Sequence, residues 1–154
     1  MKRHDALIPL SHDHHHALAQ ARRLRRSADS DDADGRLARA GDFLRFFSED
    51  TLRHFREEEE LLFPMLLERA DPPPDVLVQI LIEHVRIHGL VRRLSSEVES
   101  GSVESDTLLE TGKLLQSHIR LEERTLFPLI EELVTEQDLG RLTLADRRGA
   151  PSQP

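Results

Sequence analysis

The chain has 154 residues and a formal net charge of −8, and it contains no Cys, Tyr or Trp. This length suits one domain with a hydrophobic core, and the acidic balance argues against a nucleic-acid-binding protein. The lack of Cys excludes disulfides, thiolate zinc sites and cysteine-ligated iron–sulfur clusters. Because no apolar run approaches 18 residues and no signal peptide is recognisable, we expect a cytoplasmic protein without a membrane span.

Turn-forming residues divide the chain into four long helices and a short fifth. The long helices are expected over about residues 11–28, 36–70, 75–99 and 105–134. Ser11 is the expected N-cap of the first helix, and Pro64 should bend or end the regular part of the second. Residues 1–134 would then form one helical domain. Residues 135–154 would hold a short helix, opened by a capping box at Thr135, and a loose tail.

An eleven-residue segment occurs twice in the chain. His54-Phe-Arg-Glu-Glu-Glu-Glu-Leu-Leu-Phe-Pro64 returns 64 positions later as His118-Ile-Arg-Leu-Glu-Glu-Arg-Thr-Leu-Phe-Pro128, with seven positions identical. The first and third helices also match at an offset of 70, where Asp13-His14 aligns with Glu83-His84. The chain is therefore interpreted as a duplicated helical hairpin. Its short loops favour an all-α, up-down-up-down four-helix bundle.

Five His and two Glu fall on the apolar stripes of the four helices. A His and a Glu four residues apart share one helix face, so His54 and Glu58 interrupt the core stripe of the second helix. Buried polar groups are costly unless they are satisfied. Their number and paired arrangement favour metal ligation over a polar layer that only fixes helix register. The predicted metal ligands are His14, His54, Glu58, His84, His88, His118 and Glu122.

Several acidic residues and one further His lie next to the predicted ligands in the sequence. Four acidic residues fall off the stripes and are expected to be solvated: Glu57, Glu59, Glu60 and Glu123. For Glu59 and Glu123 a role in orienting a ligand His is the alternative. His14 is preferred over its neighbour His15 because it matches His84 in the repeat, and His15 is the fallback ligand.

The ligand set also suggests how many ions bind. Imidazole and carboxylate donors without sulfur suit iron, manganese or zinc. If Glu58 and Glu122 bridge two ions together with an oxo or hydroxo group, each ion has three ligands before any His. Three histidines then complete six-coordination at one ion: His84, His88 and His118. His14 and His54 leave the other ion five-coordinate, with an open position for a small diatomic ligand.

The ligand motifs, taken in order, resemble those of the hemerythrin-like, or HHE cation-binding, domain: Asp13-His14, His54-x-x-x-Glu58, Glu83-His84-x-x-x-His88 and His118-x-x-x-Glu122. The resemblance covers about residues 8–134 and implies a four-helix bundle with a non-haem di-iron centre held by these His and Glu side chains. Oxygen-carrying hemerythrins place Asp five residues after the last His. Here Glu122 follows His118 by four, which favours sensing, iron handling, or nitric oxide and peroxide responses over oxygen carriage.

We consider three functions for a chain with these features. The first is a di-iron protein that binds or senses dioxygen, nitric oxide or peroxide, because ligation by more His than carboxylate favours the diferrous state. The second is a di-iron oxidase or peroxidase, which ranks lower because no further acid–base group stands out. The third is a structural module that contacts an unknown protein through its Arg pairs: Arg22, Arg23, Arg92 and Arg93.

Overall fold

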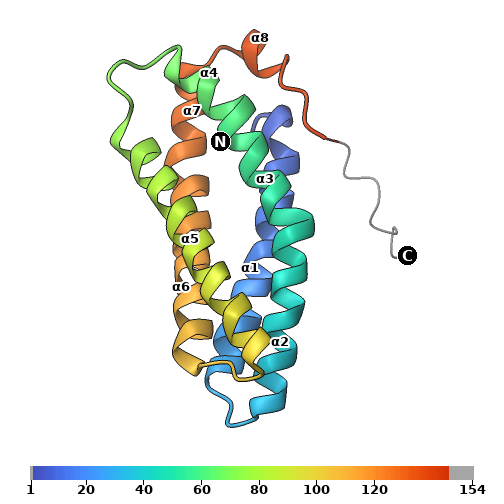
Figure 1. Cartoon of the computed structure of the whole chain (residues 1–154). Helices are drawn as coiled ribbons and strands as arrows, with labels where there is room; N and C mark the ends of the chain where they lie inside the picture. The colour runs from blue at the N-terminus through green and yellow to red at the C-terminus, as the bar shows by residue number, and fades with distance from the viewer. Residues whose placement is uncertain (1, 146–154) are drawn as a thin grey trace, which may run out of the picture.

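The computed structural model describes residues 2–145, which form helices and connecting turns without any strand. Four long helical segments lie side by side, and the short α8 (Glu136–Leu139) lies at the end of the molecule where α4 and α7 are found (Figure 1). The prediction of an all-α fold is confirmed. The tail expected to be loose from about Arg147 lies outside the described residues.

The four segments follow the order of the chain. The first consists of the 3-10 turn η1 (Asp5–Leu7) and α1 (Ile8–Ala28). The second consists of α2 (Ala33–Phe46), η2 (Phe47–Thr51), α3 (Leu52–Glu57), η3 (Glu58–Leu62) and α4 (Phe63–Leu67). The third is α5 (Asp75–Ser100), and the fourth consists of α6 (Ser105–Leu121), η4 (Glu122–Leu126) and α7 (Phe127–Leu133).

The start of α1 differs from the prediction. Ser11 is not its N-cap, because α1 begins at Ile8 with Pro9 in its first turn. The fixed φ of proline suits this position, and its missing N–H costs no helical hydrogen bond there. The hydroxyl of Ser11 instead donates to Oε1 of Glu123 at 2.7 Å.

Other helix ends follow the sequence signals. Asp32 caps α2 by accepting from the backbone N–H of Gly35 at 3.0 Å. Gly101 ends α5 with φ 78°, a left-handed conformation that glycine adopts without steric cost. Thr135 opens α8 by accepting from the N–H of Asp138.

Three π-helical turns, η2, η3 and η4, interrupt the second and fourth segments. In η3 the N–H of Phe63 donates to the carbonyl of Glu58, five residues earlier, and η4 repeats this geometry at Glu122. Each of these two turns is followed by a proline, Pro64 or Pro128. Proline lacks an N–H and clashes with the carbonyl four residues earlier, and a wider turn accommodates both effects. The effect expected at Pro64 therefore takes the form of a wide turn, after which the helix continues.

The core consists of two apolar clusters with the polar site between them. One cluster fills the end of the molecule near the α1–α2 connection and includes Leu24, Phe43 and Leu94. The other lies under α4, α7 and α8 and includes Leu10 and Ile130. Along α1, the predicted ligand His14 lies between the residues of the two clusters.

Close packing of α1 on α6 depends on a glycine. A Cβ added at Gly112 would lie 2.8 Å from the carbonyl oxygen of Ala21 and 2.7 Å from Cγ of Arg25. The helix α1 packs against α2 and α6, and α5 packs against the same two. Each of the four segments thus contacts two others.

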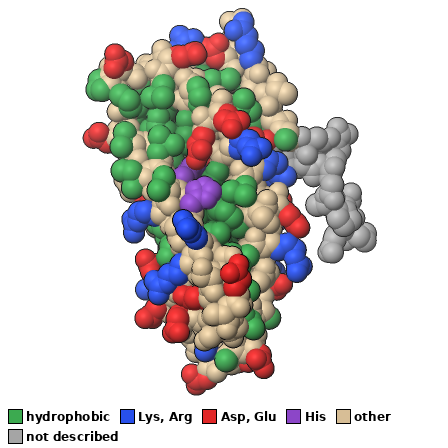
Figure 2. Space-filling view, viewed as in Figure 1, with side chains coloured by type: hydrophobic (Ala, Val, Ile, Leu, Met, Phe, Trp, Pro, Cys, Tyr) green, Lys and Arg blue, Asp and Glu red, His purple; other side chains and the backbone are tan. Residues whose placement is uncertain are grey.

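One face of the molecule carries an apolar area (Figure 2), and no described helix is suited to a bilayer. Figure 2 shows hydrophobic side chains gathered in the upper part of the face that it draws. Among the exposed large hydrophobic side chains are Ile82 and Val85 of α5, which are 55% and 72% exposed. Among residues 2–145, no helix combines the length and the apolar character needed to cross a membrane.

Candidate metal centre

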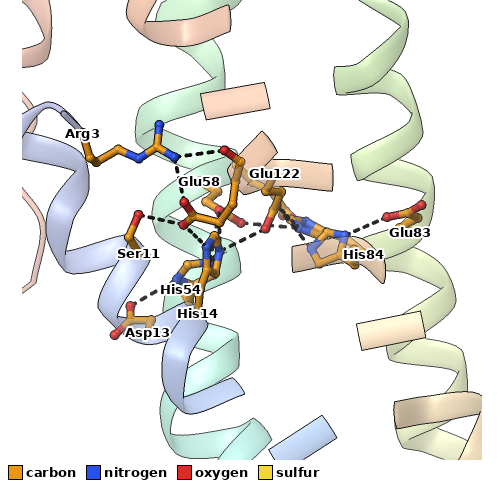
Figure 3. A network of polar contacts seen from close by, with 12 residues as sticks. Arg3, Ser11, Asp13, His14, His54, Glu58, Glu83, His84 and Glu122 are labelled. Atoms are coloured by element: carbon orange, nitrogen blue, oxygen red, sulfur yellow. Dashed lines mark hydrogen bonds and ion pairs between the residues drawn. The ribbon is translucent and has the colours of Figure 1, made fainter. Parts of the chain in front are cut away.

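Six of the seven predicted ligands come together in the interior, contributed by all four helical segments (Figure 3). None is more than 5% exposed. Their donor atoms form two sets that share Glu122. The atoms within each set lie within 4.8 Å of one another; the sets are His14, His54, Glu58 and Glu122, and His84, His118 and Glu122.

The two central carboxylates each face both sets. Oε1 of Glu58 lies 3.0 Å from Nε2 of His54, while its Oε2 lies 3.4 Å from Nε2 of His84. Glu122 is placed in the same way between the other two histidines, with Oε2 3.0 Å from Nε2 of His14 and Oε1 3.3 Å from Nε2 of His118. Each carboxylate therefore presents one oxygen to each pair of histidines.

An outer carboxylate pairs with Nδ1 of every one of these histidines. The four pairs are Glu123 with His14 (2.6 Å), Asp13 with His54 (3.1 Å), Glu59 with His84 (2.6 Å) and Glu83 with His118 (2.9 Å). Such a contact fixes the ring so that Nε2 points to the centre of the site. The sequence repeat exchanges the first pair with the third and the second with the fourth, so the outer contacts are duplicated along with the ligands.

Two of these outer carboxylates, Glu59 and Glu123, were expected to be solvated, with orientation of a ligand His as the alternative. Both contact a His, as the alternative predicts, and the side chain of Glu59 is also 42% exposed. Glu59 and Glu123 each follow a central Glu at the start of a wide turn. A turn with one extra residue shifts the side chains relative to a regular helix, so both carboxylates reach a His. Arg3 and Ser11 also hydrogen-bond to Glu123, at 2.7 Å each, and hold it in place (Figure 3).

Glu57 and Glu60 were also expected on a solvated face. Glu60 is solvated, but Glu57 is only 5% exposed. Its Oε1 accepts from the backbone N–H of Ala145 at 2.7 Å, because the segment after α8 returns along the second helical segment. This contact joins residues that are far apart in the chain and leaves no local sequence signal.

The central polar atoms lack hydrogen-bond partners. Both oxygens of Glu58, both oxygens of Glu122, and Nε2 of His84 and of His118 are buried without a hydrogen bond to any described residue. Buried polar groups are nearly always paired, so a convergent group of unpaired ones requires an explanation. Carboxylate oxygens and imidazole nitrogens aimed at common points are the donor set of a cation site.

A family comparison agrees with this geometry. The model of the hemerythrin HHE cation-binding domain matches residues 7–130. This chain belongs to the hemerythrin HHE family. The resemblance noted from the sequence is thereby confirmed, and the buried His and Glu cluster of this HHE domain fits a metal cation site. No curated protein and no solved structure gave a significant match.

The charged groups of the HHE site strongly shift the pKa values of one another. Burial lowers the pKa of His54, but the charge of Glu58 and the contact with Asp13 outweigh burial and raise this pKa to about 10. At His84 and His118 the neighbouring carboxylates also outweigh burial, and they raise the pKa of His84 to about 10 and that of His118 to about 9. Burial raises the pKa of Glu122, yet the neighbouring histidines bring it well below its usual range. Without a metal, protons on the histidines balance the carboxylates.

His88 lies outside both donor sets. It is exposed on α5, and its ring lies edge-on to Phe47 and Phe55 at centroid distances of 5.5 and 5.9 Å. Ligation by His88 stays a prediction.

At the α1 position the structure brings the buried His14, and not the exposed His15, into the site.

A cavity adjoins one side of the HHE site. It has a volume of about 170 Å³, and four of the predicted ligands line it: His14, His54, His118 and Glu122. His84 is not among the residues that line the cavity, and Phe55 stacks on its ring with centroids 3.8 Å apart. In the repeat, Phe55 corresponds to Ile119. The two halves of the site thus differ at this position, where one has an aromatic and the other an aliphatic side chain.

Proposed function

We propose that this HHE domain binds two iron ions and uses the pair to bind or sense dioxygen or a related small ligand such as nitric oxide or peroxide. One observation carries this proposal: each central carboxylate presents one oxygen to each pair of histidines. Carboxylates placed in this way can bridge two ions, and a single ion would leave one oxygen of each unused. One ion would be held by His14 and His54, the other by His84 and His118.

The choice of iron rests on the donor set. Four buried histidines and two carboxylates leave more positive charge on the ions than the carboxylate-rich sites of ferritin-like bundles. Such a site favours the ferrous state, in which iron binds small diatomic ligands. Manganese and zinc suit the same donors and would be competitors during purification.

The fold that supports this site is proposed to be the up-down-up-down four-helix bundle expected from the sequence. Short connections between consecutive segments favour antiparallel neighbours. The contacts of α1 and α5 with both α2 and α6 are those of a closed four-membered arrangement.

The second candidate function is a di-iron oxidase or peroxidase. The cavity beside His14 and His54 favours it, because an enzyme of this kind needs access for a substrate. An enzyme of this kind also needs an acid or base beside the metal, and Asp13 and Asp50 on the cavity wall are the candidates. Asp13, however, already pairs with His54 at 3.1 Å. Binding therefore remains the preferred function.

The two functions are separated by anaerobic loading with ferrous ion followed by exposure to dioxygen. A binding protein should show a near-ultraviolet and visible change that reverses on removal of oxygen or on reduction, without sustained turnover. Continuous consumption of peroxide in the presence of an organic reductant would identify the enzyme. Absence of any spectral change in a fully iron-loaded sample, with dioxygen or with nitric oxide, would contradict the proposed function.

A further inference from the structure

We propose that the hydroxyl of Thr51 donates a hydrogen bond to the small ligand held in the cavity beside His14 and His54. This inference rests on the proposed function and names the group that selects the ligand. Thr51 lies three residues before His54, so the two side chains share one face of the second helical segment.

The hydroxyl of Thr51 is buried and unpaired. Thr51 is 5% exposed, lines the cavity, and its Oγ1 makes no hydrogen bond to any described residue. It is also the only Ser or Thr among the residues that line this cavity. A buried hydroxyl without a partner is unfavourable, so a ligand that accepts its hydrogen bond gains affinity.

The local backbone explains why the hydroxyl is unpaired. In a regular helix, a buried Thr usually donates to the carbonyl four residues earlier. Thr111 does so in α6, where its Oγ1 donates to the carbonyl of Thr107 at 2.6 Å. Thr51 ends the π-helical turn η2, in which the carbonyl of Phe47 accepts from the N–H of Leu52 instead. The wide turn thus leaves the hydroxyl of Thr51 available.

The hydroxyl of Thr51 is not duplicated in the repeat. The position 64 residues after Thr51 is Leu115, which is 2% exposed and lines the same cavity with an apolar side chain. The wide turn η2 likewise has no counterpart in α6, which runs without interruption from Ser105 to Leu121. The donor and the turn that leaves it unpaired therefore occur in one half of the repeat only.

These features define the class of ligand. The ligand must carry a lone-pair acceptor next to the atom that binds the metal, and it must enter a cavity of about 170 Å³. Dioxygen, nitric oxide and azide meet both conditions. A ligand without such an acceptor gains nothing from Thr51.

Azide titration of the iron-loaded protein, followed by visible absorption, tests this inference. Thr51→Val keeps the shape of the side chain and removes the donor, so azide should bind about tenfold more weakly. Thr51→Ser keeps the hydroxyl and should restore binding to within about threefold of the original. Thr111→Val is the matched control, because its hydroxyl is already paired, and azide affinity should not change.

A second readout uses the metal-free protein. If the hydroxyl has no structural partner, Thr51→Val should leave the urea midpoint of metal-free unfolding unchanged or raise it. A lowered midpoint would indicate a structural role and overturn the inference. So would azide affinity that is equal in Thr51→Val and the original chain. If the original iron-loaded chain itself gives no azide response, the proposed function fails and the inference fails with it.

Discussion

At the scale of single residues, the site is built from pairs. Each buried histidine has an outer carboxylate on Nδ1 and a central carboxylate near Nε2, as His14 has Glu123 and Glu122. The spacing of His54 and Glu58 was sufficient to predict the inner residues, because a regular helix places both on one face. The outer partners Glu59 and Glu123 were not predicted as primary contacts, because a helical wheel assumes uniform turns.

Replacement of an outer carboxylate tests whether these pairs tune the metal. Glu123→Gln should weaken metal binding about 10- to 100-fold, since His14 loses the charge that fixes and polarises its ring. Competition with a chelator of known affinity measures the change. Glu60→Gln is the matched control, because Glu60 is exposed and forms an ion pair with Arg56 at 3.8 Å. Equal affinities in the two variants would show that the outer contact does not act on the metal.

Proton release gives a second test at this scale. The pKa of His54 and of His84 is raised to about 10 in the metal-free protein, so both rings hold protons at neutral pH. A metal ion takes the lone pair that such a proton occupies. Raising the pH therefore favours the metal, and apparent affinity should rise about tenfold per pH unit for each proton displaced. Chelator competition at pH 6.5 and pH 8 measures this slope, and an affinity independent of pH would contradict the protonated state.

At the scale of helices, the wide turns and one close contact set the positions of the predicted ligands. The repeat indicated two equivalent helical hairpins, and η3 and η4 occur at equivalent positions before Pro64 and Pro128. The third wide turn, η2, has no proline after it and no repeat partner, so no pattern in the sequence pointed to it. The start of α1 was misplaced because Ser11 resembles a cap while Pro9 marks the true first turn.

The packing of α1 on α6 should depend strongly on Gly112. Gly112→Ala places a Cβ 2.8 Å from the carbonyl oxygen of Ala21, a backbone atom that cannot move alone. The free energy of unfolding should fall by about 1–3 kcal/mol, which is typical of overpacking. Gly89→Ala in α5 is the control, since a Cβ there meets no atom within 4 Å, and it should gain up to about 1 kcal/mol from helix propensity. Urea unfolding of both variants measures the difference, and equal stabilities would contradict the close contact.

At the scale of the whole molecule, the duplicated chain forms a site that is nearly two-fold in its ligands and unequal in its surroundings. Composition and periodicity were sufficient to predict an all-α chain and its four long segments, because the apolar stripes and turn residues are local signals. The cavity could not be predicted from the sequence, because it depends on side chains from several helices that meet only in the fold. The placement of His88 outside the buried cluster likewise depends on the orientation of α5.

The content of metal per chain tests the central claim most directly. Protein purified without chelator and loaded with ferrous ion should contain close to two irons per chain by elemental analysis, with near-ultraviolet absorption after oxidation. Glu58→Ala should lose both bound iron and the stability that iron confers, because binding is linked to folding. One ion or none in the well-folded original chain, or two ions retained in Glu58→Ala, would contradict a pair of irons bridged by the central carboxylates.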